Sequence, residues 1–292
     1  MFTPIMEKQL EIPFEEYEQI DVKDSLDRKQ DILEEILGEF ANGEGPEKAK
    51  FTFRDDNYSQ RTYVHQQGIS VLRIANNKKV KWEENFETKT MDNHPSSLVI
   101  IDNRKDRQVI AIEKKETSFK KTDKLANIIQ ETFRKKLAQH RLSVDIRGKY
   151  HYAQFWEVVD VSMKLNGIES VTFPFPYPNL PQLTDMVGEY FADLARRTNS
   201  EPTLELKGQS GESVSVSKED AFMINAIKAC AASGRPILIK PKGSQRRKIG
   251  VECPVIEELS DVLLVDLDKQ ELFNSKFEGI TDFLNKIKLV YE

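Results

Sequence analysis

SLVIIDNRKDRQVIAIEKK, residues 97–115, is the stretch that most constrains the fold. It places two apolar runs around a charged turn, a pattern that predicts an antiparallel hairpin. Sequence with helical periodicity follows directly and predicts a helix over residues 123–139. The hairpin and this helix are therefore the first structural unit that the chain specifies.

A turn centred on Arg104–Asp106 sets the expected register of this hairpin. Antiparallel partners share one index sum, so Asp102 would lie opposite Gln108, and Ser97 opposite Glu113. Side chains alternate between the two faces of a strand, so residues 113 and 115 would point to the same side.

Upstream, an apolar face over residues 25–40 predicts a helix that ends at a glycine-rich segment. Short extended runs follow at 51–53, 62–65, 69–75 and 79–83, which predict a small antiparallel sheet or a partial barrel. Downstream, helical and extended patterns alternate. Helices are predicted at 123–139, 153–165, 183–197 and 218–232, and strands at 142–147, 168–175, 203–207, 236–241 and 248–253. The expected fold class is mixed α+β (α/β), with an N-terminal helix and small antiparallel sheet followed by alternating β/α units.

The proline-rich segment PFPYPNLP, residues 174–181, cannot form regular helix or a central strand. It predicts a rigid connector and a domain boundary. Residues 1–176 would hold the N-terminal helix, the antiparallel strands and the first β/α units. Residues 177–292 would hold the second β/α unit, a basic hairpin and an acidic C-terminal segment.

The composition indicates a globular protein, with 39% hydrophobic and 31% charged residues in a chain of 292. No run of about 18 uncharged apolar residues is present, and the acidic N-terminus does not resemble a signal peptide. We therefore expect a cytoplasmic protein that does not bind membranes. Cys230 and Cys253 have no zinc-site spacing and are expected to be buried free thiols.

Charge is segregated along the chain. Residues 1–50 hold 14 acidic and 6 basic residues, whereas residues 104–149 hold 6 acidic and 14 basic residues. Residues 254–292 are acidic again, with 9 carboxylates against 4 cations. Such segregation could present a basic surface to nucleic acid, or it could let acidic and basic segments, or two subunits, dock on each other.

One order of elements carries a family resemblance. A helix, three strands, Glu113-Lys114-Lys115, a helix and a further strand, over about residues 25–147, resemble the PD-(D/E)xK nuclease fold. The resemblance implies a divalent metal, Mg²⁺ or Mn²⁺, bound by Glu113 and by an aspartate on the neighbouring strand. It also implies that Lys115 positions or activates the attacking water. No other cofactor is predicted.

In the expected register, Ser97 occupies the position opposite Glu113 where that aspartate would lie. Asp102 lies five rows further along, roughly 17 Å away at about 3.4 Å per residue. Carboxylates that share a metal must each approach it within about 2–2.6 Å, so Asp102 cannot partner Glu113. Asp92, in the segment MDNHPSS, is the remaining candidate, if that segment folds back. The catalytic set of a nuclease would then be Glu113, Lys115 and Asp92, with Asp92 and Glu113 as metal ligands.

A second motif, Arg134 followed by His140, resembles the Arg-x4–6-His motif of HEPN ribonucleases. Those proteins are helical bundles, which the β-rich surroundings here do not predict. A histidine at a helix end is typical of an interaction with the helix dipole.

The best binding signal is the segment KPKGSQRRK at 240–248, on a turn predicted between two strands. A basic hairpin tip can contact phosphates without reading sequence. The alternative is an ordinary solubilising turn. The candidate nucleic-acid-binding residues are Lys240, Lys242, Arg246, Arg247 and Lys248.

Residues 97–250 also resemble uncharacterised bacterial families associated with phage defence, in a hairpin, a helix opened by a short polar cap, and a strand ending in Pro-Asn before further β/α units. The resemblance implies a bacterial setting in antiviral defence. We rank a non-catalytic nucleic-acid-associated accessory or sensor protein first, a metal-dependent nuclease second, and a protein-interaction component of a larger complex third. The expected partner is nucleic acid or an acidic protein, and a homo-oligomer is compatible with the charge pattern.

Overall fold

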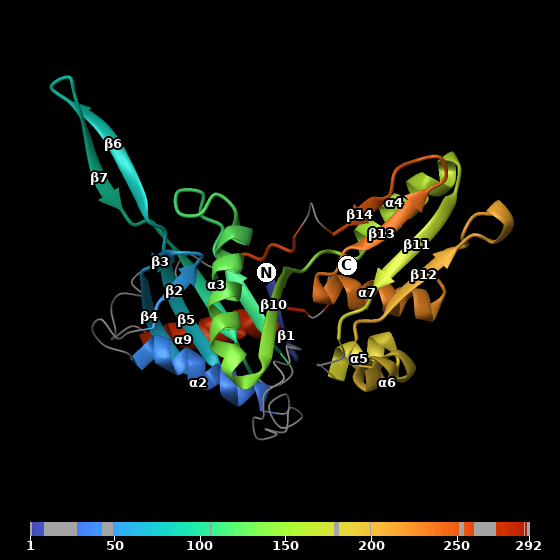
Figure 1. Ribbon diagram of the computed structural model, residues 1–292, viewed down its shortest axis with the longest axis horizontal. Coiled ribbons are helices and arrows are strands. Elements are labelled where there is room, and N and C mark those ends of the chain that lie inside the picture. The colour runs from blue at the N-terminus through green and yellow to red at the C-terminus, as the bar shows by residue number, and fades with distance from the viewer. Residues whose placement is uncertain are drawn as a thin grey trace, which may run out of the picture. The chain divides into compact units, whose positions relative to one another are not determined.

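The computed structural model describes residues 2–8, 28–42, 49–104, 107–177, 181–198, 200–250, 254–259, 273–288 and 290. Its elements form a mixed α+β protein, which confirms the predicted fold class (Figure 1). The chain divides into two compact units, Phe2–Ile146 and Arg147–Glu292, named here the N-terminal and C-terminal units. Within the described ranges, no helix is both long enough and apolar enough to cross a bilayer.

The N-terminal unit is built on a six-stranded sheet in the order β10-β1-β9-β8-β5-β4. Helices α2 and α3 pack on one face of this sheet (Figure 1). The elements of the unit are β1 (Phe2–Lys8), α2 (Lys29–Asn42), β2 (Phe51–Phe53), β3 (Asp56–Tyr58), β4 (Gln60–Gln66), β5 (Ile69–Ala75), β6 (Lys78–Glu84), β7 (Glu87–Asn93), β8 (Ser96–Asp102), β9 (Val109–Ile112), α3 (Thr122–Leu137), a 3-10 turn η2 (Ala138–His140) and β10 (Leu142–Gly148).

Helix α2 presents its apolar stripe to this core, as its 3.6-residue periodicity predicts. Three aromatic rings join α2, β2 and α3. The rings of Phe40 and Phe51 stack with centroids 4.6 Å apart, and Phe133 lies 6.2 Å from Phe40. These contacts hold both helices against the sheet.

The hairpin predicted from residues 97–115 forms β8 and β9, but its predicted register is wrong by one residue. Val99 pairs with Ile112, so Glu113 continues the ladder opposite Leu98 and not Ser97. A one-residue slip exchanges the two faces of a strand. Ser97 is buried on the face of β8 that carries Val99, and Glu113 therefore lies on the opposite face of the sheet from it.

The turn of this hairpin explains the difference. Asp102 pairs with Val109, which leaves a loop one residue longer than the symmetric turn expected from sequence. The buried Asp102 carboxylate accepts hydrogen bonds from Arg104 Nε (2.9 Å), Nη2 (2.7 Å) and the backbone N (3.2 Å). Gln108, which was expected to pair with Asp102, instead has a φ of 48° in the left-handed region. The carboxylate therefore begins the turn, and Gln108 ends it.

Strand β6 does not join the small sheet predicted for residues 51–83. It forms a separate two-stranded sheet with β7, a strand that the sequence did not predict, and this hairpin is named here the arm. In Figure 1 the arm extends beyond the other elements of its unit. Its two-residue turn, Asn85 and Phe86, has positive φ at both positions (52° and 66°), as in the turns that favour hairpins.

The C-terminal unit holds an antiparallel sheet in the order β12-β11-β13-β14. Its core lies on one face of this sheet, against α4 and α7. Asp220 caps α7 by accepting a hydrogen bond from the backbone N of Met223. The elements are α4 (Ala153–Leu165), β11 (Ile168–Pro174), α5 (Pro181–Val187), α6 (Glu189–Thr198), β12 (Thr203–Lys207), a 3-10 turn η3 (Gln209–Gly211), α7 (Ala221–Ser233), β13 (Ile237–Pro241), β14 (Arg247–Ile249) and α9 (Phe273–Lys286).

The division between the units lies at Ile146/Arg147, whereas the boundary expected after residue 176 falls inside the C-terminal unit. Strand β11, just before the proline-rich segment, pairs with both β12 and β13. Phe173 and Phe175 are also buried in the core of this unit. The prolines therefore follow a central strand of one unit and do not separate two.

Candidate nucleic-acid interface

The carboxylate of Glu113, the proposed metal ligand, is already engaged within the sheet. Its Oε2 accepts a hydrogen bond of 2.8 Å from the backbone N of Leu98 and lies 3.6 Å from Arg73 Nη1. The side chains of Glu113 and Arg73 are each about a quarter exposed. This pair ties the end of β9 to β8 and β5.

Asp92, the other proposed ligand, belongs to β7. It lies opposite Lys79 and is exposed, so the segment expected to fold back as a loop is partly a strand of the arm. In the part of the chain that the structure describes, no three His, Cys, Asp or Glu side chains gather so that they could hold a metal ion. Asp92 thus lies on the arm and Glu113 at the end of β9, and a metal site formed by these two residues with Lys115 stays a prediction.

Residues 240–248 form the hairpin that the sequence predicted, between β13 and β14. Two of its cations are paired with exposed carboxylates of β11 and β12: Lys240 Nζ lies 2.6 Å from Glu169 Oε1, and Arg246 Nη2 lies 3.3 Å from Glu205 Oε1. The other three form no ion pair with any described residue: Lys242, Arg247 and Lys248. The hairpin therefore offers three available cations and not five.

The register places part of this charge on the sheet face that points away from the core. Lys248, Leu238, Thr172 and Glu205 lie in one row across the four strands. The adjacent row contains the buried Val171 and faces the core. Lys248 is exposed and thus stands at the edge of the sheet face that points away from the core, beside the turn that carries Lys242.

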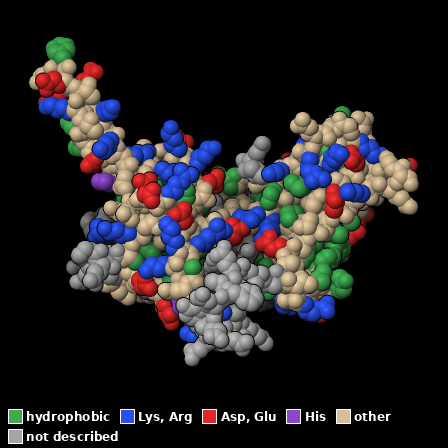
Figure 2. All heavy atoms as spheres, viewed as in Figure 1, with side chains coloured by type: hydrophobic (Ala, Val, Ile, Leu, Met, Phe, Trp, Pro, Cys, Tyr) green, Lys and Arg blue, Asp and Glu red, His purple; other side chains and the backbone are tan. Residues whose placement is uncertain are grey.

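A second basic surface lies in the N-terminal unit and runs from the end of β9 into the first turn of α3. We name it the lysine loop, residues Lys114–Lys124, which holds five lysines and two carboxylates. In Figure 2, Lys and Arg side chains gather over the start of α3, beside the base of the arm. The sequence indicated an excess of positive charge over residues 104–149, but it did not single out this loop.

Two buried residues in the middle of the lysine loop anchor it. Ser118 Oγ donates to the Pro95 carbonyl (2.8 Å), and the Ser118 carbonyl accepts from Asn76 Nδ2 (2.8 Å). Phe119 is buried, with its ring 6.3 Å from that of Tyr58. The loop is thereby tied to both ends of the arm, because Asn76 precedes β6 and Pro95 follows β7.

The lysines on either side of this anchor point outward. Lys114, Lys120, Lys121 and Lys124 are exposed, and Lys115 is partly exposed. Across the ranges that the structure describes, none of the five forms an ion pair. Helix α3 begins without a side-chain cap, since Lys121 occupies the N-cap position. Its first backbone N–H groups add to the positive potential of the loop.

Two lysines near the end of α3 form ion pairs within the unit. Lys135 pairs with Glu131 (2.8 Å), and Lys136 with Glu39 (2.5 Å). Pairing of basic side chains with acidic ones, the second possibility that the sequence left open, therefore occurs within this unit. The last turn of α3 pairs with carboxylates, whereas the loop before the helix stays unpaired.

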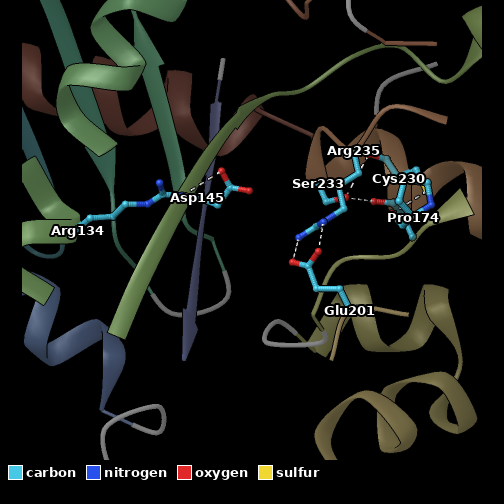
Figure 3. A network of polar contacts seen from close by, with 8 residues as sticks. Arg134, Asp145, Pro174, Glu201, Cys230, Ser233 and Arg235 are labelled. Carbon is cyan, nitrogen blue, oxygen red and sulfur yellow. Dashed lines mark hydrogen bonds and ion pairs between the residues drawn. The ribbon is translucent and has the colours of Figure 1, made fainter. Parts of the chain in front are cut away.

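Arg134 and His140 contact different partners. Arg134 Nε donates to the Val144 carbonyl (2.7 Å), and its guanidinium lies 3.8 Å from Asp145 on β10 (Figure 3). His140 lies in η2, with Nε2 3.2 Å from Gln139 Nε2. Arg134 thus joins α3 to the neighbouring strand.

A polar network inside the C-terminal unit surrounds Cys230 (Figure 3). The thiol lies 3.6 Å from the Pro174 carbonyl, and the nearby Arg235 guanidinium, only 4% exposed, pairs with Glu201. Cys230 is a buried free cysteine, as predicted, and burial raises the pKa of its thiol above the ordinary value. Cys253 lies outside the described residues.

Because the Cys230 thiol is buried, we expect the folded protein to lose stability at alkaline pH. Above pH 9, near the ordinary thiol pKa, Cys230 ionises in the unfolded chain but stays protonated in the folded one. The protonated thiol therefore makes its full contribution to stability below that pH. Above it, the free energy of unfolding should fall by about 1.4 kcal/mol per pH unit. Urea titrations of the wild type and of Cys230→Ala from neutral pH to above pH 9 measure the slope. Equal slopes in the two proteins would contradict the assignment.

In comparisons with known proteins, no family model, no curated protein and no solved structure matched this chain. The exposed cations on each of the two units thus remain as the feature of the molecule that indicates a function.

Proposed function

We propose that this protein binds nucleic acid through its phosphates, without cleaving it, as an accessory or sensor protein of the bacterial cytoplasm with a role in antiviral defence. The lysine loop is the observation that carries the proposal. It concentrates five cations that no described carboxylate neutralises. Lysines held on an anchored loop can replace the counterions of a phosphate backbone, and this exchange supplies most of the affinity in sequence-independent binding.

In the proposed contact, the protein recognises the shape and charge of the phosphate backbone and not the bases. Lysine is a flexible point charge without the planar fork that lets arginine read guanine edges. The uncapped start of α3 offers backbone N–H groups for one further phosphate. The β13–β14 hairpin, with Lys242, Arg247 and Lys248, would add contacts of the same kind. A binder without base readout suits a protein that senses nucleic acid of any sequence.

A salt titration tests the proposal. We expect Lys120→Ala/Lys121→Ala to bind labelled single- and double-stranded oligonucleotides at least about tenfold more weakly near 0.1 M salt. The slope of log affinity against log salt should lose about 0.7–0.9 per lost phosphate contact. Fluorescence anisotropy at about 50 to about 200 mM NaCl gives both quantities. The matched control is Lys50→Ala/Lys164→Ala, which removes the same charge from exposed lysines outside the loop.

Two results would count against the proposal. Equal losses in the loop variant and the control would show that only net charge matters, and no salt-dependent binding by the wild type would remove the function altogether. The same mixtures with added Mg²⁺ or Mn²⁺ should leave the strands intact. Cleavage that disappears in Glu113→Gln would favour the nuclease alternative.

A further inference from the structure

The arm is exposed along its whole length. Every residue of β7 and all but one of β6 are exposed. One face nonetheless carries large apolar side chains, with Val80 and Trp82 each 39% exposed and Met91 56% exposed. A projecting ribbon with an apolar stripe on one face is typical of a surface that becomes covered by a partner.

The outer edge of β6 is available for pairing. Apart from β7, no strand of the described chain is hydrogen bonded to it. In a hairpin with a two-residue turn, the two residues that flank the turn form a hydrogen-bonded pair, and here they are Glu84 and Glu87. The backbone N–H and C=O groups of Glu84, Trp82 and Val80 therefore point toward β7. Backbone groups alternate, and those of residues 79, 81 and 83 therefore point outward. An exposed edge of this kind can accept another strand.

The sequence of β6, KKVKWEE, is complementary to itself when reversed. Antiparallel pairing centred on Lys81 places Lys79 opposite Glu83 of the second strand, and Val80 opposite Trp82. The same pairing brings Lys78 opposite Glu84. Residues 79, 81 and 83 would form the hydrogen-bonded pairs, which agrees with the outward direction of their backbone groups. Charge, apolar contact and backbone direction thus favour one register.

We propose that the arm pairs with the arm of a second copy of this chain, β6 against β6, to form a four-stranded sheet β7-β6-β6-β7 across a two-fold axis. Each β6 contributes a Val–Trp contact and two opposite-charge pairs, and the axis makes the contact isologous. Met91 extends the apolar stripe next to Val80. The inference concerns self-association and does not depend on nucleic-acid binding.

Charge at the tip favours this occupant over nucleic acid. The last turn of the arm carries Glu83, Glu84 and Glu87, and only Glu84 is paired, 2.5 Å from Lys89 Nζ. Carboxylates beside the fully exposed Phe86 would repel phosphates, whereas the lysines at the base of another β6 would attract Glu83. The pairing has one cost, because the two Lys81 side chains meet at the axis.

A charge-exchange experiment tests the proposal. Sedimentation velocity of the full chain over rising concentration should show a weak monomer–dimer equilibrium, as expected for a small interface. Lys79→Glu and Glu83→Lys should each weaken dimerisation roughly tenfold, since each puts like charges opposite one another twice per dimer. The double variant Lys79→Glu/Glu83→Lys should recover the wild-type affinity. Lys50→Glu, a charge reversal outside the arm, is the control and should change nothing.

Mixing the two single variants gives the sharpest result. In a mixed dimer, the two carboxylates of the Lys79→Glu chain, at positions 79 and 83, would each face a lysine of the Glu83→Lys chain. The mixture should therefore dimerise more tightly than either variant does alone.

Three outcomes would overturn the proposal: a wild type that stays monomeric at every concentration, a dimer that neither single variant weakens, or a mixture that fails to pair. A monomer whose arm variants lose nucleic-acid affinity would assign the arm to nucleic acid instead.

Discussion

Asp102→Ala should lower the free energy of unfolding by about 2 to 3 kcal/mol, because it removes the acceptor around which the turn of the β8–β9 hairpin is built. Asp102 is 1% exposed, and its carboxylate accepts three hydrogen bonds from Arg104. Loss of the carboxylate leaves the guanidinium without its partner in a partly buried position and releases the backbone of the turn. The hairpin would then lose its most specific local restraint.

The measurement must report on the N-terminal unit, because a chain of two units need not unfold in one step. Hydrogen exchange of the amides in β8 and β9, measured by mass spectrometry at increasing urea concentrations, gives the free energy of local opening. Glu84→Ala is the matched control, since it removes one carboxylate from an exposed ion pair with Lys89 and should cost less than about 0.5 kcal/mol. An equal effect of the two substitutions would show that burial of the Asp102 pair contributes nothing.

Gly250→Ala should destabilise the C-terminal unit by about 3 kcal/mol, because strain and overpacking add at this position. The backbone at Gly250 has a φ of 95°, which L side chains rarely adopt, and a Cβ there would lie 2.4 Å from the ring of Tyr150. That ring is buried, and its hydroxyl donates to the Arg235 carbonyl (2.9 Å), so it cannot move aside without breaking this bond.

Gly243→Ala separates the two contributions. Gly243 also has a positive φ (69°), but a Cβ there would meet nothing within 4 Å. We expect this control to cost about 1 kcal/mol, the conformational part alone. Hydrogen exchange of the β13 amides at increasing urea concentrations gives the loss of stability of each of the two variants. If the two alanine variants are equally stable, the contact with Tyr150 is not the cause.

Much of the secondary structure could be predicted because it follows from local patterns. The helix at residues 153–165 was predicted with the bounds that the structure shows, and the hairpin of residues 97–115 forms β8 and β9. One predicted helix, at 183–197, is instead divided into α5 and α6 at Gly188, where φ is 87°. Apolar periodicity predicts a helix well but does not mark an interruption of this kind.

The candidate site was predicted in part. The hairpin at residues 240–248 and the excess of cations in residues 104–149 were read correctly from sequence, since composition and turn residues are local properties. Which cations remain available was not predictable. Glu169 lies 71 residues from Lys240, and Glu205 lies 41 residues from Arg246. These carboxylates neutralise the two cations only because the sheet brings them together.

Strand β7 was missed for a related reason. ETKTMDN has no apolar alternation, and its polar residues form a strand only because β6 lies beside it. That pairing moved Asp92 out of the loop where a metal ligand was expected and created the exposed edge on which self-association is proposed.

Local order along the chain was thus enough to specify the α+β class, most of the helices and strands, and the two basic segments, because each depends on neighbours a few residues apart. The register of the hairpin, the division at Ile146/Arg147, the arm and the pairing of individual charges were decided only in the tertiary structure. Each of these depends on partners far apart in sequence, and a shift of one residue exchanges the faces of a strand, so periodicity alone cannot choose among them.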